Sequence, residues 1–139
     1  MLAMFVLAAE PAVAGSTIKP RPGTYKGVLA APRTEYRVTL VVSHGGLTRA
    51  AVSNIPLYCS SGGPPTPVRF AASKIAPSGA FSTTGRYTIK IGRFKGKVGE
   101  KLKLSGRFGS SGSVSGVLAT TFVLNAPHCV GRTGFTAAL

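Results

Sequence analysis

Apolar and polar residues alternate along several segments of this chain, and a period of two is typical of β-strands with one buried face. The clearest case is residues 35–43, in which Tyr36, Val38, Leu40 and Val42 fall on one face. No segment shows a convincing period of 3.6 residues. The pattern therefore predicts strands and no helix.

Two later segments are predicted to be strands for the same reason. In residues 101–108, the apolar Leu102, Leu104 and Phe108 fall on one face, and the basic residues of the segment fall on the other. Residues 113–124 form a long run whose larger apolar side chains also share one face. Each segment can cover a hydrophobic core with one side and meet solvent with the other.

Glycine and proline mark the breaks between these segments. Gly45 and Gly46 predict a tight turn that leads into a strand over residues 47–55. Proline-rich residues 19–22 and 62–67 are not expected to form central strands. With about eight strands in all, we predict an all-β fold: an antiparallel β-sandwich (Ig-like or jelly-roll-like) or a partly closed barrel.

The start of the chain has the pattern of an export signal. Residues 2–9 form a short apolar run, and an Ala-Val-Ala triplet ends at Ala14. This predicts a secretory signal peptide over residues 1–14, possibly truncated since no basic residue precedes the run; a buried N-terminal strand is the alternative. The run is shorter than the ~20 residues of a membrane span. We then expect a proline-containing arm over residues 15–22, a single β domain over residues 23–139, and a secreted or cell-envelope location.

The two cysteines agree with export. Cys59 and Cys129 lie far apart and lack the C-x-x-C spacing of redox and zinc sites. In an oxidising compartment the simplest expectation is that they form one disulfide. Closing a loop of about 70 residues stabilises a fold by up to ~4 kcal/mol in the chain-entropy description.

The charge of the chain is strongly unbalanced. It contains 17 basic and three acidic residues, no aspartate, and a net charge of +14. Behind the predicted leader only Glu35 and Glu100 remain. Glu35 lies between two arginines, and Glu100 is expected in a turn beside Lys101, so both are interpreted as solvated ion-pairing residues. Paired-carboxylate catalysis and calcium binding are therefore disfavoured.

Other catalytic patterns are equally weak. No G-x-S-x-G nucleophile motif occurs, and the His44-Gly45-Gly46 run is better explained as a turn. His128 is adjacent to Cys129, and neighbours on a strand point to opposite faces, which is the wrong geometry for a catalytic dyad. The two histidines and two cysteines lack zinc-finger spacing. We predict no enzyme activity, no cofactor and no metal site.

Basic residues are concentrated near the middle of the domain. We interpret them as a candidate surface for polyanions, with a solvated strand face as the alternative. If residues 95–98 and 101–104 paired across a turn near Gly99, their four lysines would crowd one face. The candidate residues are Lys90, Arg93, Lys95, Lys97, Lys101, Lys103 and Arg107.

The kind of polyanion is narrowed by the aromatic residues. Single-stranded nucleic acids are usually bound by interleaved aromatics, but the basic stretch offers only Phe94 and Phe108, and Phe108 is expected to face inward. There is no tryptophan for stacking on sugars. Together with export, this favours an anionic polymer of the cell envelope or matrix, and no specific nucleic acid.

The chain carries a G-x-Y-x-G start at 23–27, S-G-x-F at 78–81 and 105–108, and C-x-G at 129–131, with the other cysteine at 59. The order of these motifs resembles that of a largely uncharacterised family of small secreted all-β proteins, found mostly in actinobacteria. The resemblance spans nearly the whole predicted domain. Where that family often has tryptophan, this chain has Phe135. The resemblance implies an all-β fold, a disulfide and export, and it implies no catalytic residue.

Two functions of different classes follow. The leading hypothesis is a secreted, non-enzymatic binding or structural module that contacts an anionic polymer through its basic surface. The alternative is a β-barrel carrier of a small apolar ligand, in which the basic surface serves solubility only. A third and weaker hypothesis is a cationic defence protein that disrupts anionic membranes.

Overall fold

The fold is described by a computed structural model, which places nine strands within the residues that it describes. Those residues are 17–30, 37–55, 66–88, 92–93, 95–122 and 131–139. The strands are β1 (Gly23–Leu29), β2 (Arg37–Ser43), β3 (Gly46–Ile55), β4 (Thr66–Phe70), β5 (Ser73–Lys74), β6 (Ala80–Thr88), β7 (Val98–Phe108), β8 (Ser113–Phe122) and β9 (Gly131–Ala138).

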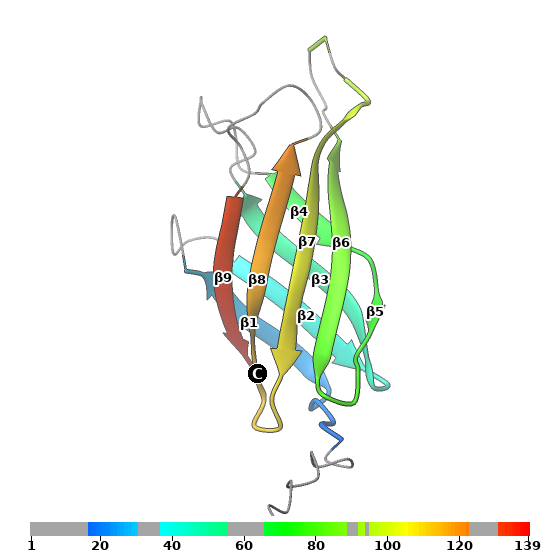
Figure 1. Cartoon of the computed structure of the whole chain (residues 1–139), viewed down its shortest axis with the longest axis vertical. Helices are drawn as coiled ribbons and strands as arrows, with labels where there is room; N and C mark the ends of the chain where they lie inside the picture. Colours follow the sequence, from blue (N-terminus) through cyan, green and yellow to red (C-terminus); the bar gives the residue numbers. More distant parts are fainter. Residues whose placement is uncertain (1–16, 31–36, 56–65, 89–91, 94, 123–130) are drawn as a thin grey trace, which may run out of the picture.

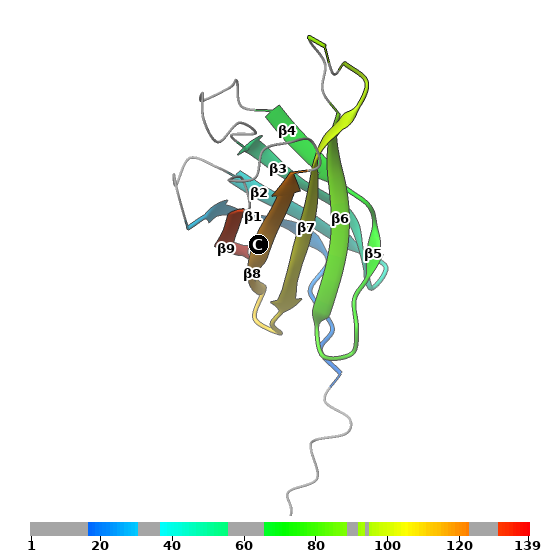
Figure 2. The same cartoon turned by 45° about the horizontal axis from the view of Figure 1, so that its top comes forward.

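The strands form a closed, up-and-down antiparallel barrel (Figures 1 and 2). Each main strand pairs with the next one along the chain, and β1 pairs with β9, so the first and last strands meet. The short β5 continues β4, because both pair with β3 in the same register, from Val52–Val68 to Gly46–Lys74. The barrel therefore has eight strands around its circumference, with β4 and β5 counted as one.

The prediction of an all-β antiparallel fold is confirmed, but the β-sandwich was wrong and the barrel is closed rather than partly closed. A sandwich has free sheet edges, whereas here β1 bonds to β2 on one side and to β9 on the other. Strands with one buried face suit both architectures equally. The difference lies in long-range pairings such as Leu29–Phe135, which alternation within a strand does not reveal.

Alternation places the apolar side of each strand in the barrel interior. The inward positions predicted for the second and seventh strands, including Val38, Leu40, Leu102 and Leu104, are buried. They belong to a single hydrophobic cluster, to which each of the eight main strands contributes. Eight strands enclose a space that side chains can fill, and these buried side chains point into it.

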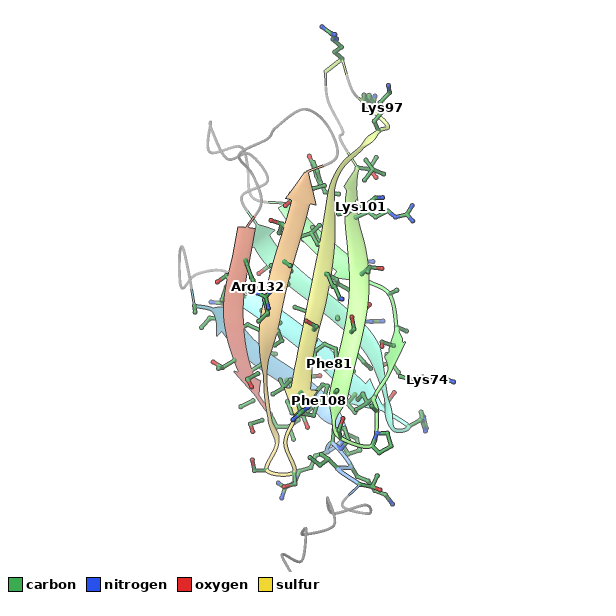
Figure 3. All side chains as sticks on the ribbon, viewed as in Figure 1. Lys74, Phe81, Lys97, Lys101, Phe108 and Arg132 are labelled. Carbon is green, nitrogen blue, oxygen red and sulfur yellow. The ribbon has the colours of Figure 1, made fainter. Side chains whose placement is uncertain are left out.

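Three aromatic rings occupy one half of the interior. Tyr25 meets Phe108 edge-on with ring centroids 5.1 Å apart, and Phe81 lies 5.2 Å from Phe108 (Figure 3). The Tyr25 hydroxyl donates to the carbonyl oxygen of Arg21 at 2.9 Å, which ties the segment before β1 to the barrel. Edge-to-face packing of this kind stabilises a core beyond the area that it buries.

The turn between β2 and β3 has the geometry that its sequence predicts. His44 and Gly45 both have positive φ, at 52° and 76°, and Ser43 pairs with Gly46 across them. Two consecutive residues with positive φ form the hairpin turn that matches the right-handed twist of the strands. The residues following the turn continue as β3, as predicted.

The joint between β4 and β6 is the thinnest in the described barrel. Phe70 pairs with Gly85, and the Ala71 N–H donates to the carbonyl oxygen of Thr84 at 3.0 Å. Pro67, from the proline-rich stretch that was not expected to form a central strand, lies in β4. A proline is tolerated there because β4 reaches its partner β6 only at its far end, so this stretch resembles an edge strand.

Because every strand reverses direction, the connections alternate between the two ends of the barrel. The β1–β2, β3–β4, β6–β7 and β8–β9 connections leave from one end, and the others leave from the opposite end. Several parts of the chain named above lie outside the described residues. They are the predicted leader, the arm before residue 17, Glu35, Tyr36, Cys59, Lys90, Phe94, His128 and Cys129. Within the described part of the chain, no helix is long and apolar enough to span a membrane.

Candidate anion-binding face

The predicted basic residues fall into two structural groups. The group on β7 projects from the outer surface of the barrel, and the other lies in the turn between β6 and β7 (Figure 3). All of the described ones are exposed, while Lys90 lies outside the described residues. The β7 group is Lys101, Lys103 and Arg107, and the turn group is Arg93, Lys95 and Lys97.

The hairpin predicted around Gly99 was wrong. Val98–Phe108 is one continuous strand, and Gly99 lies within it. Tyr87 pairs with Glu100 and Thr88 with Val98, so Gly99 is the extra residue of a β-bulge rather than a turn residue. Lys95 and Lys97 consequently sit in the turn before the strand and do not pair with the lysines of β7.

The register between strands brings further basic residues close to β7. Lys103 pairs with Ala119 on β8, and Ala119 pairs in turn with Arg132 on β9, so these three outward-facing residues form one row across the strands. A second row of paired residues runs from Arg107 through Ser115 on β8 and Thr136 on β9 to Val28 on β1. Lys26 lies one row beyond, paired with Ala138, which in turn pairs with Ser113.

We call the outer side of β7, β8, β9 and β1 the basic face. Cations stand on both sides of it, while β8 and β9 present a strip of small side chains between them. The cations are Lys101, Lys103 and Arg107 on β7, Arg132 on β9, and Lys26 on β1. The strip contains Ser113, Ser115, Val117, Ala119, Gly134, Thr136 and Ala138.

A groove of about 770 Å³ lies along the part of this face nearer the β7–β8 hairpin. Arg107 borders it on one side and Lys26 on the other. Ser115 and Thr136 lie in its floor, and Val28, an apolar side chain that is 40% exposed, forms part of its wall. The groove thus combines two cations and hydroxyl groups with a lining that is mostly apolar and includes Ile18.

The sequence did not predict three basic residues that lie near the lysines of β7. Lys26 and Arg132 belong to the basic face, and Arg86 lies beside it on β6. They lie in other segments of the chain and meet β7 only through strand pairing. The available signal was parity, because Arg132 and the inward Phe135 occupy positions of opposite parity on one strand. Parity shows whether a side chain points inward or outward, but it does not show which strands lie beside it.

Like charges are placed directly opposite each other on this surface. Arg86 on β6 pairs with Lys101 on β7, and both side chains are exposed. Facing like charges destabilise a sheet by a few tenths to about 1 kcal/mol. An anion bound between them would remove that repulsion.

The outside of the described barrel carries no compensating carboxylate side chain. All basic residues except Arg33 and Lys90 lie within the described ranges, and every one of them is exposed. The acidic residue in those ranges is Glu100, which is 2% exposed. The charged side chains on the outer surface of the described ranges are therefore all positive.

The expectation that Glu100 is solvated in a turn was wrong. It shares the inward parity of Leu102 and Leu104, and it lies on β7 between Tyr87 of β6 and Phe122 of β8. The Gly99 bulge precedes it. Glycine beside charged residues suggested a turn, but a bulge also favours glycine and re-aims the next side chain.

Burial changes the acidity of the Glu100 carboxyl. Desolvation raises its pKa from 4.5 to about 7, although the hydrogen bond from the Thr120 side chain opposes the increase. Its Oε2 atom has no hydrogen-bond partner among the described residues. Burial likewise raises the pKa of Tyr25, against the opposing effects of the Arg21 charge and backbone.

The remaining chemistry-bearing residues do not assemble into a second site. His44 lies exposed in the β2–β3 turn. In the described ranges, no three histidine, cysteine, aspartate or glutamate residues cluster around a position that could hold a metal ion.

Comparison with known proteins adds no assignment. No protein-family model, no curated protein and no solved structure matches this chain.

Proposed function

We propose that this protein is an exported, non-enzymatic binding module that holds a linear anionic polymer of the cell envelope or matrix on its basic face. The main support is the arrangement of Lys101, Lys103 and Arg107 on one side of a strip of small side chains, with Arg132 and Lys26 on the other. A polymer lying on the strip reaches cations on both sides without displacing a large side chain.

The energetics of such binding follow from the charge. A polyanion releases condensed counterions when protein cations neutralise its charges, so affinity falls steeply with salt concentration. The absence of carboxylate side chains from the described outer surface removes intramolecular partners that would otherwise occupy the cations. Lys26, Lys101, Lys103, Arg107 and Arg132 of the basic face are all exposed to solvent.

Export and a Cys59–Cys129 disulfide are part of this proposal. The β3–β4 connection contains Cys59, and the β8–β9 connection contains Cys129. Both connections leave from the same end of the barrel, which is a necessary condition for the two cysteines to pair.

Charge reversal on β7 tests the function. We expect Lys101→Glu, Lys103→Glu and Arg107→Glu together to weaken co-sedimentation with purified cell envelopes. The slope of log affinity against log salt should fall by about three, one for each lost charge contact. Stability should not fall, because Glu at position 101 would face Arg86 and replace a repulsive pair with an attractive one.

A matched control separates a defined face from general charge. Arg49, Arg69 and Lys74 are exposed on β3, β4 and β5, away from the strands of the basic face. Reversing these three changes the net charge by the same amount. Equal loss of binding in both triple variants, or no loss in the β7 variant, would rule out a binding site on the basic face.

The second candidate function is an interior carrier of a small ligand. Closure of the barrel favours it, since closed eight-stranded barrels can hold one small molecule. The buried apolar cluster inside the barrel, to which every main strand contributes, counts against it. The same experiment separates the two functions, because a carrier would be indifferent to charge reversal on its outer surface.

A further inference from the structure

We infer that the polymer is a flexible phosphodiester chain without rings, of the polyol phosphate class, and that a single chain lies along the groove on β8 and β9. This inference rests on the proposed function and adds the chemical class of its ligand. It is carried by the placement of aromatic residues, the width of the strip and the chemistry of its floor.

The aromatic side chains that the structure describes point into the barrel. Tyr25, Phe81, Phe108 and Phe135 are buried, as is Phe70, and Tyr87 packs against the core. In the described residues, no aromatic ring projects from the basic face. Bases of single-stranded nucleic acid gain about 1–3 kcal/mol each by stacking on such rings. This face therefore offers no platform for ligands that depend on ring stacking.

The width of the strip suits a single extended chain. Lys103 and Arg132 are separated by two strand spacings, or about 10 Å at the backbone, and Arg107 and Val28 by three, or about 14 Å. Along β7, Lys101 and Lys103 are two residues apart, about 7 Å. A chain with regularly spaced charges can contact both walls at several points along its length.

The floor of the groove suits phosphates joined by short polyols. Hydroxyl groups of Ser113, Ser115 and Thr136 can donate to phosphate oxygens and accept from polyol hydroxyls. The partly exposed Val28 offers an apolar contact to methylene groups. Arg107 presents a planar fork of donors that matches two oxygens of one phosphate.

Competition among defined polymers tests the ligand class. The full-length protein would be titrated with poly(glycerol phosphate), oligo(dT) and polygalacturonate, matched in the number of charges and held at one salt concentration. We expect poly(glycerol phosphate) to bind at least about tenfold more tightly than either of the others. Equal or tighter binding of oligo(dT) or polygalacturonate would overturn the ligand class.

Filling the groove tests where the chain lies. Ser115→Phe keeps the charge and places a bulky side chain on the floor, whereas Ala51→Phe makes a comparable change at a half-buried outward position on β3. We expect Ser115→Phe to reduce poly(glycerol phosphate) binding at least tenfold and Ala51→Phe to leave it unchanged. Thermal unfolding of both variants establishes that each remains folded, and Ser115→Trp provides a second occlusion if Ser115→Phe does not fold.

The outcomes distinguish failure of the inference from failure of the proposed function. If charge reversal on β7 weakens binding but groove filling does not, the polymer binds the basic face outside the groove and the inference is wrong. If charge reversal on β7 changes nothing, the proposed function itself is wrong, whichever polymer binds best.

Discussion

At the scale of single residues, Glu100 stands apart from the rest of the chain. The described outer surface is uniformly basic, yet this carboxyl group lies in the barrel interior with one oxygen unpartnered among the described residues. Burying a carboxylate without a compensating charge is costly, so the neutral form is favoured. The pKa of about 7 means that the group changes charge near neutral pH.

The stability of the barrel should therefore decrease as pH rises. Because the folded state raises the Glu100 pKa from 4.5 to about 7, the native protein binds this proton more tightly than the unfolded chain does. The contribution is complete below about pH 4.5 and is lost as pH rises through 7, for a total of roughly 3 kcal/mol. Urea unfolding of the wild type and of Glu100→Gln at several pH values between 4.5 and 8 measures it.

Glu100→Gln removes the titrating group but keeps its size. We expect the variant to lack this decrease and to exceed the wild type in stability at pH 8. A decrease of the same size in Glu100→Gln would show that another group is responsible.

At the scale of elements, two glycines allow β7 and β8 to approach closely beneath aromatic rings. Gly106 and Gly116 pair with each other at inward positions, and Gly116 also pairs with Phe135 on β9. A Cβ at position 116 would lie 2.7 Å from Cε1 of Phe135 and would also meet the carbonyl oxygen of Ser105. The rings occupy the space that side chains at the glycine positions would need.

We expect Gly116→Ala to destabilise the protein by about 1–3 kcal/mol, the usual cost of overpacking a core. Gly134→Ala is the matched control, because a Cβ at position 134 meets its nearest atom, the carbonyl oxygen of Gly116, at an ordinary 3.7 Å. Chemical denaturation of the two variants gives the comparison. A Gly116→Ala protein as stable as Gly134→Ala would mean that the strands separate freely here.

The same glycines explain how far the sequence could predict the elements. β2 and β7 were predictable, since every inward position from Val38 to Val42 and from Leu102 to Leu104 is a large apolar residue. In β1 the inward position 27 is glycine, so alternation is blurred. Ring closure through β1 and β9 depends on pairing across the whole chain, about which local patterns are silent.

The candidate site was predictable only in part, for a related reason. Lys101, Lys103 and Arg107 lie on a strand with clear alternation, so their common outward facing follows from the sequence. Arg132 and Lys26 are separated from them by tens of residues, and strand register alone brings them to the same face. A cluster of basic residues that are close in sequence can be predicted. A cluster that is assembled from several strands cannot, because the strand register is not known from the sequence.

At the scale of the whole molecule, the barrel has two ends of different character. One end is formed by short connections, including the His44–Gly45 turn and the hairpin at Gly112, whose φ is 81°. At the other end lie the strand ends that lead into and out of the longer connections, two of which contain Cys59 and Cys129 in the sequence. A covalent bond between two of these connections would join the β3–β4 and β8–β9 sides of the barrel, which β4 and β6 hold together through few backbone contacts.

We expect the proposed Cys59–Cys129 disulfide to stabilise the barrel. We expect no reactive thiol in the denatured, non-reduced protein and two after reduction. Reduction should lower the free energy of unfolding by up to ~4 kcal/mol, because the bond closes a loop of about 70 residues and so limits the unfolded chain. Thiol titration and urea unfolding with and without reductant measure both effects. Two reactive thiols before reduction would exclude the bond, and the barrel would then depend on strand pairing and its core alone.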